Sequence, residues 1–253
     1  MPRTLIDPAD IISGSWKNFT KNWRLYAEFT IWIILLSLLV WVLNILIRSL
    51  LPDRITASLV FFATTLPISV VFGVILAAVI DATAKTLRGG KADVRSSLAV
   101  GAHKLLSLIW ISFLVTLMLV LGFILLIVPA LIFGVWYAFS TNHLIVDDVR
   151  GTGALKKSKA LVSGRWWPVM FRIAVPWLVF ALSAGFGLRL TYLLLGAVLG
   201  DPGTFFGTIA DVYALTDLHL LVTTIVPQIF YGLSLPLFIG ANLILWNDLK
   251  RPS

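Results

Sequence analysis

The stretch Phe29–Ile47 reads FTIWIILLSLLVWVLNILI and contains no Asp, Glu, Lys or Arg. A helix needs about 20 predominantly apolar residues to cross the hydrocarbon core of a bilayer. This run therefore predicts a transmembrane helix. Its amide side chain, Asn44, is costly to bury in hydrocarbon alone, so we expect it to make an interhelical hydrogen bond.

Uncharged runs of similar character follow along the chain. Residues 55–80 come directly after the short polar segment RSLLPDR, which predicts a hairpin with the first helix. Residues 105–146 contain no Asp, Glu, Lys or Arg and are too long for one crossing. They fit two crossings, with the turn near Gly122 and Pro129.

The last two crossings differ in clarity. Arg172 and Arg189 bracket sixteen uncharged residues, which reach about 24 Å, slightly short of a core about 30 Å thick. Either both arginines extend to the interfaces, or the helix runs to about Leu199 and leaves Arg189 at membrane depth. Residues 220–247 predict the sixth crossing, with Pro227 and Pro236 as kinks.

Composition supports the same class. Of the 253 residues 59% are hydrophobic and only 13% are charged, whereas soluble domains have about 45–50% and about 25%. We therefore expect a single all-α, polytopic membrane domain over residues 1–253. There is no cysteine, which excludes disulfides and thiolate chemistry.

The distribution of positive charge predicts the orientation. With the N-terminus inside, seventeen Lys and Arg fall in inner segments and three, namely Arg48, Arg54 and Arg189, in outer ones. This bias predicts that both termini lie on the cytoplasmic side of the membrane. It also accounts for the net charge of +8 without nucleic acid as a partner. Asp7 and Asp10 precede the first apolar run, so we expect no cleavable signal peptide.

Three cytoplasmic segments precede the odd-numbered crossings and look alike when aligned on Ser15, Ser97 and Ser158. Each has helical spacing with apolar positions on one face, which is typical of helices lying in the membrane interface. The chain thus divides into candidate units 7–86, 91–147 and 152–253, each an interfacial helix plus a hairpin. The alternative is that any amphipathic segment beside a membrane looks similar. The basic and tryptophan residues expected at lipid headgroups are Lys17, Lys21, Trp23, Arg24, Lys104, Lys156, Lys157, Lys159, Arg165, Trp166 and Trp167.

The most distinctive stretch is LLIVPALIFGVWYAFSTNHLIVDDVRGTGALKKSKALVSGRWWPVMF. It resembles the membrane domain attached to some bacterial glycerophosphoryl diester phosphodiesterases, and related stand-alone inner-membrane proteins, over roughly residues 120–175. The family's usual Pro-Gly in the turn is Pro129-Ala130 here. The resemblance implies a multi-helix membrane domain rather than the catalytic barrel, and it assigns no functional residue.

A second set of residues carries polar chemistry inside or beside the membrane. His143 and Asp147 lie four residues apart, so they share a helix face and offer two ligands to a cation, which is too few for a metal site. Asp147 and Asp148 would alternatively pair with Arg150, Lys156 or Lys157, and Asp81 occupies a similar helix end. The candidate intramembrane polar site comprises Asn44, Asp81, His143, Asp147, Asp148 and Arg189.

These patterns favour a non-enzymatic protein. The sequence shows no catalytic constellation, and we expect no cofactor. The leading hypothesis is binding or organising of anionic phospholipids, with assistance of lipid movement as its sharper form. One alternative is a small-solute transporter, in which Pro67, Pro176, Pro227 and Pro236 would break helices. The other is a membrane scaffold for a partner enzyme.

Overall fold

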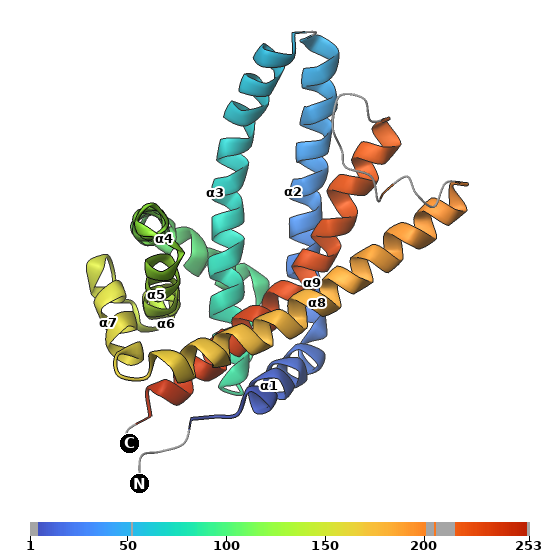
Figure 1. The fold of residues 1–253 in the computed structure, drawn as a ribbon. Coiled ribbons are helices and arrows are strands. Elements are labelled where there is room, and N and C mark those ends of the chain that lie inside the picture. Colours follow the sequence, from blue (N-terminus) through green and yellow to red (C-terminus); the bar gives the residue numbers. More distant parts are fainter. Residues whose placement is uncertain (1–4, 52, 201–204, 206–215, 252–253) are drawn as a thin grey trace. The chain divides into compact units, whose positions relative to one another are not determined.

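The computed structural model describes residues 5–51, 53–200, 205 and 216–251. Of the seventeen Lys and Arg assigned to inner segments, Arg3 lies outside these residues. All regular secondary structure within the described residues is helical, and no strand occurs among them. The helices, labelled in Figure 1, are α1 (Pro8–Lys21), α2 (Trp23–Leu50), α3 (Arg54–Leu87), α4 (Val94–Leu125), α5 (Ile127–Tyr137), α6 (Ser140–Asp147), α7 (Thr152–Val162), α8 (Trp166–Val198) and α9 (Asp217–Leu249).

Six helical segments of the described chain are long and apolar enough to cross a membrane. They are α2, α3, α4, the segment Ile127–Asp147 that contains α5 and α6, α8, and Leu218–Leu249 of α9. The predicted all-α class with six spans is therefore confirmed. Apolar residues such as Leu182, Phe186 and Leu194 are more than half exposed, which suits side chains that face lipid.

The fifth crossing is longer than the sixteen-residue alternative. α8 continues for 33 residues through Pro176, and Arg189 lies within it rather than at its end. Pro67 of α3 and both prolines of α9 are likewise enclosed by unbroken helices. These helices are therefore not broken at the prolines, as the transporter alternative would require, and the kinks at Pro227 and Pro236 stay a prediction. The break inside a crossing falls instead at Ala138 and Phe139, between α5 and α6.

The three amphipathic segments end differently. α1 begins at Pro8, where Asp7 caps it by accepting a hydrogen bond from Ala9 N at 2.9 Å, and it ends at Lys21 with Asn22 as the C-cap. α7 ends before Gly164, whose φ of +78° favours glycine. The second segment is no separate helix, because no breaker separates it from the crossing that follows. Capped by Asp93, it forms the first turns of α4.

The chain divides into two compact units. The first, called the basic unit here, comprises residues 1–25, 73–179 and 236–253. It contains α4 to α7 complete, with α4 packed along α5 and α7 packed on α5 and α6. Its buried core includes Phe139, Ile111, Leu144 and Trp246.

The second unit comprises residues 26–72 and 180–235. Within it, close helix contacts need small residues: a Cβ on Gly232 would lie 2.7 Å from Thr30 Cγ2, and one on Gly187 would lie 2.6 Å from Phe230 Cε1. Small residues at helix interfaces are typical of membrane bundles, where packing rather than hydrophobicity drives association.

Candidate functional site

The three aligned serines are all buried and all bind a membrane helix of the basic unit. Ser15 Oγ of α1 donates to Leu237 O of α9 at 2.7 Å, and Ser97 Oγ of α4 donates to Asp81 Oδ2 of α3 at 2.8 Å. Ser158 Oγ of α7 donates to Trp136 O at 2.7 Å and accepts from Phe139 N at 3.1 Å. Each serine therefore fastens its amphipathic segment to the second helix of a hairpin.

Most predicted headgroup residues lie on the exposed side of these segments. Lys17, Lys21 and Arg24 are exposed beside α1, and the guanidinium carbon of Arg24 lies 5.7 Å from the centroid of the Trp23 ring. Lys156, Lys157 and Lys159 are exposed on α7, followed by exposed Arg165 and Trp167 and partly buried Trp166. The basic faces are thus available to anionic groups.

Lys104 lies apart from this exposed set. Its side chain is only 13% exposed, and Nζ donates to Leu144 O and Ile145 O, both at 3.1 Å. It also forms an ion pair with Asp148 Oδ1 at 2.9 Å. A cation at the last carbonyls of a helix is stabilising, so Lys104 caps α6 instead of presenting charge to lipid.

Asp148 lies outside the membrane spans, with an exposed side chain. The hydrogen bond from Lys104 and the charges of Lys104 and Arg150 hold the pKa of this carboxyl below its usual range. Sequence reasoning expected Arg150, Lys156 or Lys157 as partners of the two aspartates. Arg150 Nε does lie 4.0 Å from Asp148 Oδ1, as expected, but the closer partners are Lys104 for Asp148 and Lys250 for Asp147.

His143 and Asp147 do meet, as their spacing predicted. His143 Nδ1 lies 2.8 Å from Asp147 Oδ2, and Lys250 Nζ donates to both oxygens of Asp147 at 2.9 Å. The indole of buried Trp246 donates to His143 Nε2 at 3.3 Å. Because an indole N–H only donates, Nε2 accepts and the ring proton sits on Nδ1. Both ring nitrogens are thus engaged, which makes the group a clasp between α6 and α9.

The other predicted polar residues do not join this cluster. Asp81 binds Ser97 and forms an ion pair with Lys85 at 2.6 Å. Asn44 and Arg189 belong to the second unit. Asn44 Oδ1 is buried and has no hydrogen-bond partner in the described part of the chain, so the interhelical bond predicted for Asn44 is not made through this oxygen. Nor do three or more His, Asp or Glu side chains come together as metal ligands among the described residues.

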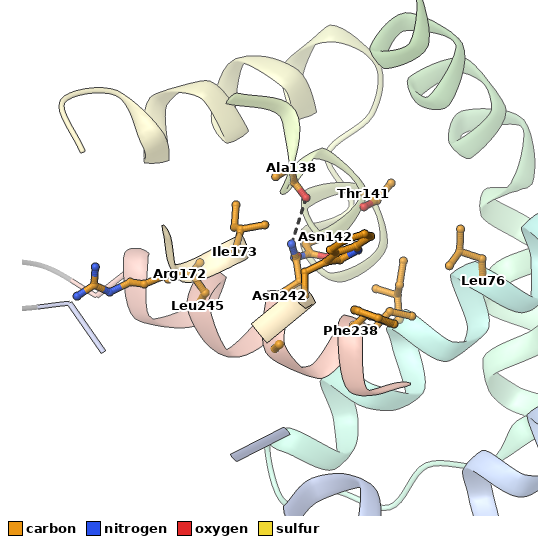
Figure 2. A pocket seen from close by; sticks show the side chains of 13 residues that line it. Leu76, Ala138, Thr141, Asn142, Arg172, Ile173, Phe238, Asn242 and Leu245 are labelled. Atoms are coloured by element: carbon orange, nitrogen blue, oxygen red, sulfur yellow. Dashed lines mark hydrogen bonds between the residues drawn. The ribbon is translucent and has the colours of Figure 1, made fainter. Parts of the chain in front are cut away.

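Sequence reasoning missed a pair of asparagines that lines a small pocket (Figure 2). Asn142 Nδ2 donates to Asn242 Oδ1 at 2.5 Å, and Asn242 Nδ2 reaches Ala138 O at 3.5 Å. A signal for this pair exists, because NHLIVDDVR from Asn142 and NLILWNDLK from Asn242 are similar. The pocket holds about 240 Å³, below the usual size of ligand sites.

Arg172 is the charged residue among the described residues that line this pocket. Its guanidinium donates hydrogen bonds to three backbone carbonyl groups. Nε donates to Ile6 O at 2.7 Å, Nη1 to Pro168 O at 3.0 Å and Nη2 to Leu5 O at 3.3 Å. Arg172 therefore anchors the N-terminal segment to α8. The pocket has polar groups that already bind one another, which indicates a structural junction.

A larger apolar track runs along α8 in the basic unit. One hollow of about 550 Å³ lies between α4, α5 and α8, and a second of about 740 Å³ lies between α5 and the α7–α8 turn. Both are lined by Leu131 and Met170, which makes them neighbours. We call the two hollows together the α5–α8 groove.

Positive charge lies at one end of the α5–α8 groove. Lys159 Nζ sits 4.1 Å from the centroid of the Trp136 ring, and Trp136 lines the second hollow. Arg165 stands in the chain between Gly164 and Trp166, which also line it. An apolar groove that ends beside exposed Lys159, with exposed Arg165 next in the chain to two of its lining residues, suits an amphiphile with an anionic head.

Comparison with known proteins leaves the resemblance of residues 120–175 as a prediction. No family model, curated protein or solved structure matches this chain.

Proposed function

We propose that this chain is a non-enzymatic protein of a bacterial inner membrane that binds anionic phospholipid in the α5–α8 groove. In this proposal both termini are cytoplasmic, and the basic faces of α1 and α7 meet the inner leaflet. The charge bias of the loops supports this orientation. The observation that carries the proposal is the apolar groove ending beside Lys159 and Arg165.

The headgroup has to supply the selectivity of such a site. A lipid tail is about as well solvated by other tails as by a protein groove, so its transfer gains little free energy. Each Lys or Arg near an anionic lipid contributes about 1 kcal/mol. Lys159 and Arg165 together would therefore favour an anionic over a neutral lipid by about 2 kcal/mol, or roughly thirtyfold.

Native mass spectrometry of lipid retained by the purified protein tests this proposal. The protein is taken from nanodiscs with equal amounts of phosphatidylglycerol and phosphatidylcholine. We expect enrichment of phosphatidylglycerol, and its loss in the double variant Lys159→Gln, Arg165→Gln. The matched control Lys17→Gln, Lys21→Gln removes the same charge from α1, away from the groove, and should keep the enrichment.

Equal loss in the two double variants would show attraction by net charge alone and would contradict a defined site.

The resemblance to the phosphodiesterase membrane domain supports a place beside lipid headgroups within this proposal. It also keeps a scaffold for a partner enzyme as a second reading, for which a reproducible partner in pull-downs is the test.

A further inference from the structure

The fourth crossing is discontinuous, and other helices supply the groups that maintain the break. α5 ends at Tyr137 and α6 begins at Ser140. The backbone groups freed there bind Ser158, through Trp136 O and Phe139 N, and Asn242, through Ala138 O. Non-helical backbone within a membrane is tolerated where protein surrounds it or where it lines a cavity, and broken helices often form binding sites.

The break leaves one buried hydroxyl without a partner. Serine and threonine on helices commonly bind the carbonyl four residues earlier, as Thr30 and Ser37 do here. For Ser140 that carbonyl belongs to Trp136, and Ser158 already donates to it. Ser140 is 1% exposed, and its Oγ has no hydrogen-bond partner within the described chain.

Ser140 lines a pocket of about 340 Å³ between α4 and the α5–α6 break. This volume is far above the roughly 30 Å³ share of one water molecule. Among the described residues that line it, none is charged, and five carry hydroxyl groups: Ser112, Thr116, Tyr137, Ser140 and Thr141. Hydroxyls both donate and accept, so the lining matches a neutral ligand with several hydroxyl groups and disfavours an ion.

Two apolar residues connect this pocket to the α5–α8 groove. Leu119 and Gly134 line both the hydroxyl pocket and the first hollow of the groove. An amphiphile with its head among the hydroxyls would therefore find an apolar surface for its chain next to it.

From these contacts we infer that the hydroxyl pocket binds a neutral polyhydroxylated head group, such as a single sugar ring. The ligand differs from the anionic phospholipid proposed above, because none of the described residues that line this pocket is a cation. The head group has two sources, a free sugar or a glycolipid, and the shared apolar residues favour the glycolipid.

Photo-crosslinking of the full chain in nanodiscs tests the inference. The probe is a dodecyl glucoside with a diazirine in its chain, and the comparison probe is a dodecyl phosphocholine with the same chain. We expect saturable crosslinks from the glucoside to the α4 and α5 peptides that contain Leu119 and Gly134. Free glucose at millimolar concentration competes with the probe and abolishes these crosslinks if the natural ligand is a free sugar. The crosslinks persist in glucose if binding needs the alkyl chain of a glycolipid.

The variant Ser140→Ala should weaken glucoside crosslinking about fivefold, the order of one net hydrogen bond. Without ligand it should leave the melting temperature unchanged or raise it, because it removes an unsatisfied buried hydroxyl. The control Ser37→Ala, from a buried serine that is hydrogen-bonded, should leave crosslinking unchanged. The inference is overturned if the phosphocholine probe labels equally, since the pocket would then not select a sugar. It is also overturned if Ser140→Ala crosslinks like the unaltered chain, since the Ser140 hydroxyl would then not contact the head group.

Discussion

Asn142 and Asn242 stand one hundred positions apart in the chain, yet their side chains meet through a hydrogen bond of 2.5 Å. The segments that follow them are similar in sequence, and both end in the clasp in which Lys250 binds Asp147. The two related segments of the basic unit are thus joined at their first residues and again through Asp147 and Lys250. We expect this junction to carry a measurable part of the stability of the basic unit.

A double-mutant cycle tests the asparagine pair. Asn142→Leu and Asn242→Leu each leave a buried or half-buried amide without its partner, so each should lower the free energy of unfolding by about 1–2 kcal/mol. The double variant should cost less than the sum, because neither amide remains. Unfolding in bicelles measures the three values, and strictly additive losses would contradict the pairing.

The aligned serines should differ in their contributions. Ser158 makes two hydrogen bonds at the helix break, and Ser97 binds a carboxylate, whereas Ser15 donates to one carbonyl. We expect Ser158→Ala and Ser97→Ala to cost about 1–3 kcal/mol and Ser15→Ala about 1 kcal/mol. Melting temperatures of the three variants in one detergent give the order, and Ser15→Ala as the most harmful change would refute it.

Two glycines let the amphipathic segments approach the membrane helices. A Cβ at Gly240 would lie 2.5 Å from Ser15 Oγ, and one at Gly101 would press on the backbone carbonyl of Val74. Gly101→Ala and Gly240→Ala should therefore destabilise the fold by about 1–3 kcal/mol. Gly185 of α8 meets nothing within 4 Å, so Gly185→Ala should be neutral or stabilising, by up to about 1 kcal/mol. Equal effects at Gly101 and Gly185 would count against the close approach.

The lowered pKa of Asp148 predicts that the stability of the fold depends on pH. Its pKa is lowered in the folded chain by the Lys104 hydrogen bond, so the unfolded chain binds more protons at acidic pH. The stabilisation is present above the ordinary pKa of an aspartate and is lost as the pH falls through the lowered value. Asp148→Asn should reduce the melting temperature at about pH 7 and have less effect near pH 3. The same decrease at both pH values would contradict this role.

Hydropathy predicts the crossings because each transmembrane segment has to be long and apolar enough to span the bilayer, whichever helices it packs against. The partners of Lys104 and Lys250 were beyond sequence reasoning, since several acidic residues lie within reach and tertiary packing selects among them. The continuity of α4 was missed because an amphipathic first turn looks the same whether or not the helix bends after it. The Asn142–Asn242 pair could have been found from the repeated segment, although similarity alone would not have shown that the copies meet.

The orientation across the membrane stays a prediction from the loop charges, and cysteine labelling tests it. Single cysteines at Gly90 and Gly153 should be shielded from an impermeant reagent added to intact cells, and one at Gly203 should be labelled. The opposite pattern would place the basic faces of α1 and α7 on the outer side. The proposed contact with the inner leaflet would then be lost.

An electron cryo-microscopy structure in nanodiscs that contain phosphatidylglycerol tests the binding of anionic lipid most directly. The proposal predicts density for one phospholipid along α8, with its phosphate beside Lys159 and Arg165 and a chain between Leu131 and Met170. An empty groove, or ordered phosphates found around α1 but not at Lys159, would contradict it.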